Sequence, residues 1–322
     1  MDENSFCPSF APDTILKFNI VNHTLFGLPK EEDYQVSKVR GIKTILEAKP
    51  TIEGAGVRLK RVFGYHEKEL MDPFLLLDHF GSDNPEDYLK GFPWHPHRGI
   101  ETITYMIDGK VEHEDSMGNA GSINSGDVQW MTAGSGIIHQ EMPKGYEGTM
   151  MGFQLWANLP RSNKMMHPRY QEIKSSEIPV IERDDGARVR IICGNLDGTC
   201  GPVSEIVTDP EYMDVTVLAG KEFTHSVKEG HTVFAYVFEG EGYFDQKRNT
   251  LIHTGQLVLY EDGDQIVVKA GEKQLRFLLV SGMPIGEPIA WYGPIVMNSR
   301  EELEQAFEEY RAGTFIKHSR RK

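Results

Sequence analysis

Four potential metal ligands occur as two closely spaced pairs within residues 93–143. His95 is followed two positions later by His97, and His139 is followed in the same way by Glu141. Because successive side chains of a β-strand point to opposite faces, residues two positions apart share one face. Two such pairs on neighbouring strands would bring three imidazoles and one carboxylate together. This set suits iron, manganese, nickel, copper or zinc better than calcium or magnesium, so the sequence predicts a transition-metal site.

Glycine residues punctuate the segment that carries these pairs. Glycine marks turns, bulges and places where backbones approach closely. The 32 glycines of the 322-residue chain favour an all-β protein of many short strands. The pattern near the two pairs is typical of a small β-barrel whose mouth carries the site, and its glycines are Gly99, Gly109, Gly118, Gly121, Gly126, Gly134 and Gly136.

The same segment resembles the two cupin motifs and, in detail, the pirin family. The matching runs are HPHRG from His95 and GDVQWMTAGSGIIHQEMP from Gly126. The resemblance extends from about Val36 to about residue 315, and includes DPFLLLD at 72–78, GFQLW at 152–156 and GPIVMN at 293–298. It implies an all-β bicupin fold of two tandem cupin barrels. It also implies one metal ion in the N-terminal barrel, usually iron, with manganese, nickel, copper, zinc and cobalt as alternatives.

The resemblance assigns the metal ligands to His95, His97, His139 and Glu141. The common cupin pattern would instead use a glutamate soon after the first histidine pair, which here is Glu101. We therefore expect Glu141 to be the carboxylate ligand. Glu101 is expected beside the ligands, as a base or an alternate ligand, or else as a hydrogen-bonded strand carboxylate near the barrel mouth. Both glutamates are candidate catalytic groups.

The net charge and the cysteines argue against several kinds of binding partner and metal site. The chain has 48 acidic and 34 basic side chains, a formal net charge of −14, which repels nucleic acid and anionic lipid. Cys7, Cys193 and Cys200 are odd in number and lack the spacing of a thiolate metal site, which favours a reducing compartment. No segment has the pattern of a signal peptide or of a membrane span. We expect a monomer in the cytoplasm, and also in the nucleus if the source is eukaryotic, that binds neither nucleic acid nor membrane.

A repeated rhythm of short strands divides the chain. We expect an N-terminal extension over residues 1–35, a metal-binding cupin domain over 36–160, a connection over 161–187 and a second cupin domain over 188–322. Aligning the two halves puts Ser226 and Lys228 at the positions of the first histidine pair. The second ligand pair is matched by Val268 and Ala270, so the second domain is expected to hold no metal.

A helix is expected at the end of the second domain. Ser299 and Glu302 have the spacing of a capping box, in which each side chain bonds the other residue's backbone N–H. Apolar residues then recur at helical spacing, and Gly313 ends the helix.

The resemblance implies quercetin 2,3-dioxygenase activity, in which a metal site cleaves a flavonol with dioxygen. Two alternatives stay open: a metal- and redox-dependent regulator that binds a transcription-related protein partner, and a cupin that acts on another small molecule. His79 is expected to be structural and His113 to lie at the surface. The basic residues Arg58, Lys60 and Arg61 are expected to face solvent. The candidate pocket walls are Phe92, Trp94, Met106, Trp130 and Trp156.

Overall fold

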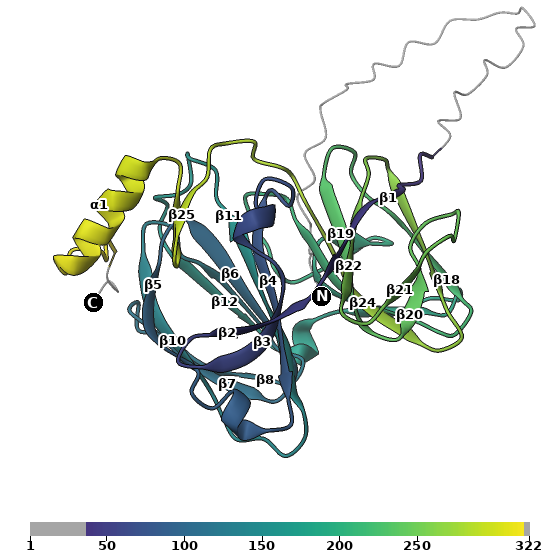
Figure 1. Ribbon diagram of the computed structural model, residues 1–322, viewed down its shortest axis with the longest axis horizontal. Helices are drawn as coiled ribbons and strands as arrows, with labels where there is room; N and C mark the ends of the chain where they lie inside the picture. The colour runs from purple at the N-terminus through teal and green to yellow at the C-terminus, as the bar shows by residue number, and fades with distance from the viewer. Residues whose placement is uncertain (1–36, 319–322) are drawn as a thin grey trace, which may run out of the picture. The chain divides into compact units, whose positions relative to one another are not determined.

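The computed structural model describes residues 37–318, and β-strands dominate them (Figure 1). Positions 38–318 belong to one compact unit. The expected extension over residues 1–35, with Cys7, lies outside the described residues. No helix within residues 37–318 is long and apolar enough to cross a bilayer.

The first half of the described chain forms a seven-stranded and a four-stranded antiparallel sheet, here called the first sheet pair. The seven strands, in spatial order, are β12 (Arg169–Ile173), β9 (Val128–Thr132), β6 (Ile100–Asp108), β11 (Met150–Asn158), β4 (Phe74–Ser82), β3 (Val57–Phe63) and β2 (Lys49–Glu53). The four strands are β5 (Phe92–His97), β10 (Ile137–Pro143), β7 (Lys110–Asp115) and β8 (Ala120–Asn124).

The second half repeats this plan as the second sheet pair. Its seven strands are β1 (Ile42–Glu47), β22 (Gln256–Tyr260), β19 (Thr232–Glu239), β24 (Leu275–Gly282), β17 (Glu211–Val217), β14 (Ala187–Cys193) and β13 (Val180–Glu182). Its four strands are β18 (Glu222–Ser226), β23 (Gln265–Ala270), β20 (Glu241–Tyr243) and β21 (Leu251–His253). Two small hairpins complete the strands: β15 (Asn195–Leu196) with β16 (Thr199–Cys200), and β25 (Ala290–Tyr292) with β26 (Ile295–Met297).

Several strands lie outside the domain to which the sequence analysis assigned them. Strand β1 was expected in the first domain, but it pairs with β22 in the second sheet pair. The segment expected to be a connection contains β12, which pairs with β9, and β13, which pairs with β14. Alternating apolar residues predict a strand but not its partner, so these edge strands could not be placed from the sequence.

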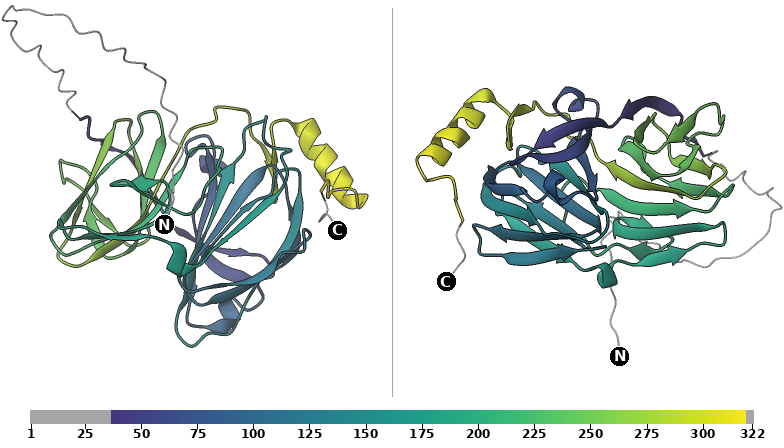
Figure 2. Two further views of the ribbon diagram at one scale, coloured as in Figure 1. Left: turned by 180° about the vertical axis from the view of Figure 1, so that it is seen from behind. Right: turned by 60° about the horizontal axis from the view of Figure 1, so that its bottom comes forward.

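The central strands of each seven-stranded sheet, such as β6 and β19, are buried on both faces. One face of the first sheet, with Tyr105 and Phe153, shares an apolar core with Tyr212 and Tyr236 of the second. The blue to teal and the green strands form two adjoining groups in Figure 2. The other face of each sheet turns toward its own four-stranded sheet. The interior of the second sheet pair is an apolar cluster, and that of the first contains the candidate site.

The expected helix is α1 (Arg300–Arg311). The capping box of Ser299 and Glu302 is present, and Gly313 adopts a positive φ of 72° after the helix. Ala306 is buried against Ile295.

Helix α1 is tied to the first sheet pair through Arg98, although the sequence analysis assigned it to the second domain. Arg98 forms an ion pair with Glu309, and its Nη2 donates to the carbonyl of Phe315.

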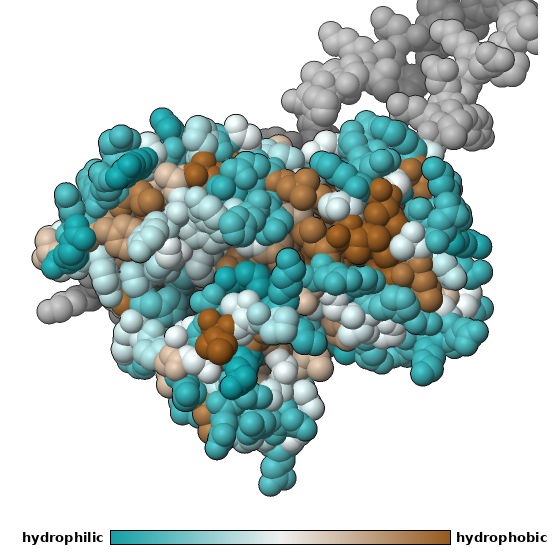
Figure 3. All heavy atoms as spheres, viewed as in Figure 1, coloured by the Kyte–Doolittle hydropathy of each residue, from teal (hydrophilic) through white to brown (hydrophobic). Residues whose placement is uncertain are grey.

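The face of the molecule shown in Figure 3 is largely hydrophilic, in keeping with the net charge of −14. A hydrophobic region lies over the strands labelled β1 and β22 in Figure 1. Strand β1 contributes Ile42, Ile45 and Leu46, which are only partly buried against the two apolar clusters.

Candidate metal centre

Three histidines converge in the interior of the first sheet pair. His95 and His97 lie on β5, and His139 lies opposite His95 on the antiparallel neighbour β10. The Nε2 atom of His95 is 3.0 Å from that of His97 and 2.9 Å from that of His139. Among residues 37–318 these histidines are the only group of three or more possible ligands brought so close together. The i, i+2 spacing therefore placed both histidines of the first pair as expected.

The other ring nitrogens determine which tautomers are present. Nδ1 of His95 lies 2.8 Å from the carbonyl of Pro93, and Nδ1 of His97 lies 3.1 Å from that of Pro294. Each Nδ1 must donate its proton to the carbonyl, so each Nε2 of a neutral ring carries a lone pair. The lone pairs of His95 and His97 then face each other at 3.0 Å, which is repulsive unless a cation lies between them.

The histidine cluster fits a metal ion better than a proton. Burial, followed by the neighbouring imidazoles, holds the pKa values of His97 and His139 well below the usual range, so these rings are neutral. Two nitrogen ligands at about 2.1 Å from an ion and about 90° apart would be about 3.0 Å from each other. The observed separations of 3.0 and 2.9 Å match this spacing.

His113 lies directly behind His139, and the sequence analysis missed this contact. Its Nδ1 is 3.5 Å from Nδ1 of His139, and its Nε2 is 3.4 Å from Oδ2 of Asp115. The His113 ring stacks on Tyr170. The expected surface position was wrong, because His113 is 2% exposed. The available signal was the pattern His113-x-Asp115, which puts both side chains on one face of a strand.

Glu141 lies on β10 and lines the same cavity as His95 and His97. The pairing of β10 with β5 shifts between His139 and Glu141, where the strand is irregular. Thr104 Oγ1 lies 2.9 Å from Oε1 of Glu141 and donates to it. Glu141 is therefore held in the cavity wall beside the histidines, but it is not part of their close cluster.

Glu101 faces away from the histidines, so its expected place beside the ligands was wrong. Its neighbour Thr102 pairs with Trp156, which lines the cavity, whereas Glu101 pairs with Thr132 and Ala157. Thr132 Oγ1 donates to Glu101 Oε1 at 2.7 Å, and burial raises the pKa of Glu101. A shift of one residue along a strand reverses the face, so Glu101 points toward the core shared by the two seven-stranded sheets.

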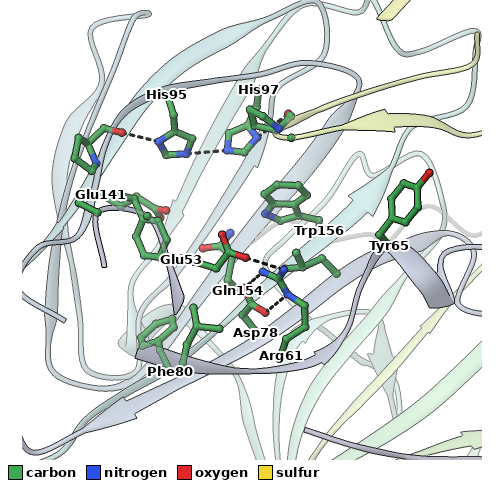
Figure 4. A pocket seen from close by; sticks show the side chains of 18 of the residues that line it. Glu53, Arg61, Tyr65, Asp78, Phe80, His95, His97, Glu141, Gln154 and Trp156 are labelled. Carbon is green, nitrogen blue, oxygen red and sulfur yellow. Dashed lines mark hydrogen bonds and ion pairs between the residues drawn. The ribbon is translucent and has the colours of Figure 1, made fainter. Parts of the chain in front are cut away.

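A cavity of about 780 Å³ opens beside the histidines (Figure 4). Of the predicted walls, Phe92 and Trp156 line it. Trp94 is 46% exposed, and Met106 and Trp130 pack in separate apolar clusters. The lining residues that the sequence analysis did not identify come mostly from β2, β3, β4 and the β25–β26 turn, and include Glu53, Arg61, Tyr65, Asp78, Gln154, Trp291, Tyr292 and Pro294.

Arg61 corrects a further expectation, because it does not face solvent. It shares the inner face of β3 with Leu59, and both line the cavity. His79, next to Asp78, points to the opposite face and meets Tyr236 Oη at 2.9 Å, in keeping with its expected structural role.

The corresponding interior of the second sheet pair is apolar. Val268 is fully buried and lies opposite Phe223 in the pairing of β23 with β18. Ala270 belongs to the same apolar cluster, whereas Ser226 is exposed. The positions that would match the ligands are therefore filled by packed or exposed side chains.

Comparison with known proteins agrees with this architecture. The family model described as Pirin matches residues 56–157, and the one described as Pirin C-terminal cupin domain matches residues 212–316. A pirin-like protein of Caulobacter vibrioides is 44% identical over 278 residues, which cover 86% of this chain and 99% of the relative. A pirin-like protein of Solanum lycopersicum is 42% identical over 275 residues, covering 84% of this chain and 91% of the relative.

A solved structure has the same fold. The crystal structure of quercetin 2,3-dioxygenase from Acinetobacter baumannii is 32% identical, with a TM-score of 0.80 over 86% of this chain and 99% of that one. The expected all-β fold with two cupin domains is thus confirmed. By sequence, fold and the arrangement of its two sheet pairs, the chain belongs to the pirin family of bicupin proteins.

Proposed function

We propose that this protein is a metal-dependent dioxygenase that cleaves a flavonol such as quercetin. One divalent transition metal, iron, would be held by the three histidines and by Glu141. The observation that carries the proposal is the pair of imidazole lone pairs that face each other at 3.0 Å in a buried site. Similarity to a quercetin 2,3-dioxygenase at 32% identity supports the choice of reaction.

A bound metal would supply Lewis acidity toward substrate oxygens and a redox partner for dioxygen. The overall reaction adds both oxygen atoms of dioxygen to the flavonol and releases one ring carbon as carbon monoxide. Glu141 would accept the proton of the 3-hydroxyl group, because its carboxylate lies in the cavity wall. Thr104 holds this carboxylate by donating to Oε1, which keeps it oriented in the wall.

The cavity suits a flat aromatic substrate. Trp156 lies 5.0 Å from His97 between ring centroids, Trp291 lies 6.0 Å from Trp156, and Tyr65 lies 5.6 Å from Trp291. These rings form a continuous aromatic wall that begins at the histidines. Such a wall binds a planar substrate by stacking and excludes water from the reacting groups.

Elemental analysis followed by oxygen uptake with quercetin tests the proposal. Wild-type protein should contain one transition-metal ion per chain, and His97→Ala or His139→Ala should lose most of it. The matched control is His225→Ala, which removes a buried histidine from β18 of the second sheet pair. Unchanged metal content in both ligand variants would disprove the site.

Turnover is tested separately on the metal-loaded protein. Glu141→Gln keeps an oxygen that Thr104 can bond but removes both the base and the carboxylate proposed as a metal ligand, so oxygen uptake per bound metal ion should fall by about 100-fold or more. Bound metal without any flavonol turnover in the wild type would disprove the dioxygenase reaction. That outcome would favour a metal-dependent regulator.

A further inference from the structure

A row of polar side chains crosses the inner face of the first seven-stranded sheet. Thr104, Gln154, Asp78 and Arg61 are successive cross-strand neighbours on β6, β11, β4 and β3. Arg61 donates to both oxygens of Asp78, each at 2.8 Å, and forms a 2.8 Å ion pair with Glu53 at the end of β2. The row therefore reaches from the sheet edge to its centre.

The other end of this row meets the candidate metal centre. Thr104 Oγ1 lies 2.9 Å from Glu141 Oε1 and 2.9 Å from the amide group of Gln154. A hydroxyl group has one proton, so both contacts are satisfied when Gln154 turns its NH₂ toward Thr104 and Thr104 donates to Glu141.

The fold does not require polar residues here, as the second sheet pair shows. The row at the matching positions of its four strands is Ala235, Leu279, Met213 and Ile191. All four side chains are fully buried and apolar. Burying an ion pair costs desolvation energy that apolar packing avoids, so the polar row of the first sheet pair points to a ligand.

Figure 4 shows where this ligand would lie. His95 and His97 occupy one side of the cavity, and Glu53, Asp78 and Arg61 occupy the opposite side. Trp156 lies between them, and Trp291 packs against Trp156. A planar molecule bound at the histidines would extend toward the three charged side chains, which we call the acidic cluster.

The charge of the acidic cluster selects the kind of group that it can bind. Two carboxylates face one guanidinium, so the cluster has a formal charge of −1. The Nε, Nη1 and Nη2 groups of Arg61 each direct one N–H to the two carboxylates, which leaves two of its five N–H groups. Each carboxylate keeps lone pairs after these bonds, so the cluster accepts hydrogen bonds and repels anions.

We propose that Glu53, Arg61 and Asp78 form a recognition site for phenolic hydroxyl groups at the end of the substrate remote from the metal. The substrate class is then an aromatic molecule with a metal-chelating oxygen pair at one end and hydroxyl groups on a ring at the other. This inference rests on the proposed function, because binding to the metal centre fixes which end of the substrate lies at the histidines. The net charge of −1 disfavours molecules that carry a carboxylate or phosphate at the remote ring.

Binding without turnover tests this site. Three flavonols share the 3-hydroxy-4-carbonyl group but carry zero, one or two hydroxyl groups on the phenyl ring. Their affinities are measured by calorimetry on the metal-loaded protein without oxygen. The dihydroxylated ring should bind the wild type about tenfold tighter than the plain ring, as expected for one or two added hydrogen bonds.

Two variants of Glu53 identify the group that is recognised. Glu53 is 39% exposed in its side chain and ends an edge strand, so its replacement should leave the fold intact. Glu53→Leu should reduce the tenfold preference to about threefold or less, whereas Glu53→Gln, which keeps an acceptor oxygen, should retain most of it. The matched control, Glu112→Leu, removes an exposed acid outside the cavity and should leave the preference unchanged.

Three results would overturn the proposal. One is equal affinity of the wild type for all three flavonols, which would leave the dioxygenase function intact. The second is that Glu53→Gln and Glu53→Leu lose the tenfold preference equally. The third is that a flavonol with an amine binds more tightly than one with a hydroxyl at the same ring position. The last two would show that the cluster recognises positive charge. Absence of oxygen uptake would remove the dioxygenase function only, because this assay uses no oxygen.

Discussion

Replacing His113 by phenylalanine should weaken metal binding without unfolding the protein. When His139 binds a metal through Nε2, its proton must reside on Nδ1, and the neighbouring acceptor is Nδ1 of His113 at 3.5 Å. Phenylalanine keeps a ring that can stack on Tyr170, as His113 does at 5.1 Å between ring centroids. It removes the Nδ1 acceptor and the 3.4 Å contact of His113 with Asp115, whose Oδ2 still accepts from Asn119 Nδ2 at 2.8 Å. His139 would then hold a buried N–H without a partner in the metal-bound state.

The size of the effect follows from the difference between the two states. An unsatisfied buried donor costs about 1–3 kcal/mol. Without metal, His139 can move its proton to Nε2 and donate to His95, whose Nε2 is 2.9 Å away, so the metal-free protein avoids this cost. The variant therefore loses free energy of metal binding and not stability of the metal-free fold. Because 3.5 Å is a long hydrogen bond, we expect the lower part of the range, about a tenfold increase in metal Kd.

Competition with a chromophoric chelator measures this Kd. The matched control is His253→Phe, a replacement of an exposed histidine in the second sheet pair. The reasoning is refuted if the Kd of His113→Phe stays within about twofold of the wild type. It is also refuted if the metal-free variant loses as much stability as the metal-bound one, since His113 would then act only in packing.

Two further predictions concern buried groups outside the cavity. Burial lowers the pKa of His79 from 6.5 to about 4, so between these pH values the unfolded chain binds a proton that the folded chain does not. The free energy of unfolding should therefore fall by at most about 3 kcal/mol as the pH falls from about 6.5 to 4. Urea titrations across this pH range should show that the free energy of unfolding of His79→Gln depends less on pH than that of the wild type. An equal pH dependence in both proteins would contradict the lowered pKa of His79. Glu101→Gln should keep full metal content and flavonol turnover, because Glu101 bonds Thr132 on the opposite face of the sheet. Loss of metal in this variant would restore Glu101 as a ligand.

The positions of the histidines followed from a short pattern that determines geometry, whereas their role as metal ligands stays a prediction. The spacing of His95 and His97 placed both rings on one face of β5, and antiparallel pairing brought His139 beside them. The same rule of alternation should have excluded Glu101, which lies one position away from the inward-facing Thr102. The resemblance to the common cupin pattern favoured Glu101 and overrode that rule.

The residues that the sequence analysis missed are brought to the site by contacts between distant segments. Trp291 and Pro294 come from the β25–β26 hairpin, and Pro294 accepts a bond from His97 almost two hundred residues earlier in the chain. Arg61 was assigned to solvent because a basic residue on a strand usually faces water. Its inward orientation became evident only with its partner Asp78 on the neighbouring strand.

The sequence by itself determined the all-β class, the tandem repeat, the capped C-terminal helix and the histidine positions, because each depends on periodicity or spacing within a short segment. Only the tertiary structure decided that β1 completes the second sheet, that His113 stands behind His139, and that three charged side chains face the histidines across a cavity. These features depend on which strands become neighbours. Strand pairing over long sequence separations is set by the burial of whole sheet faces, which no local pattern specifies.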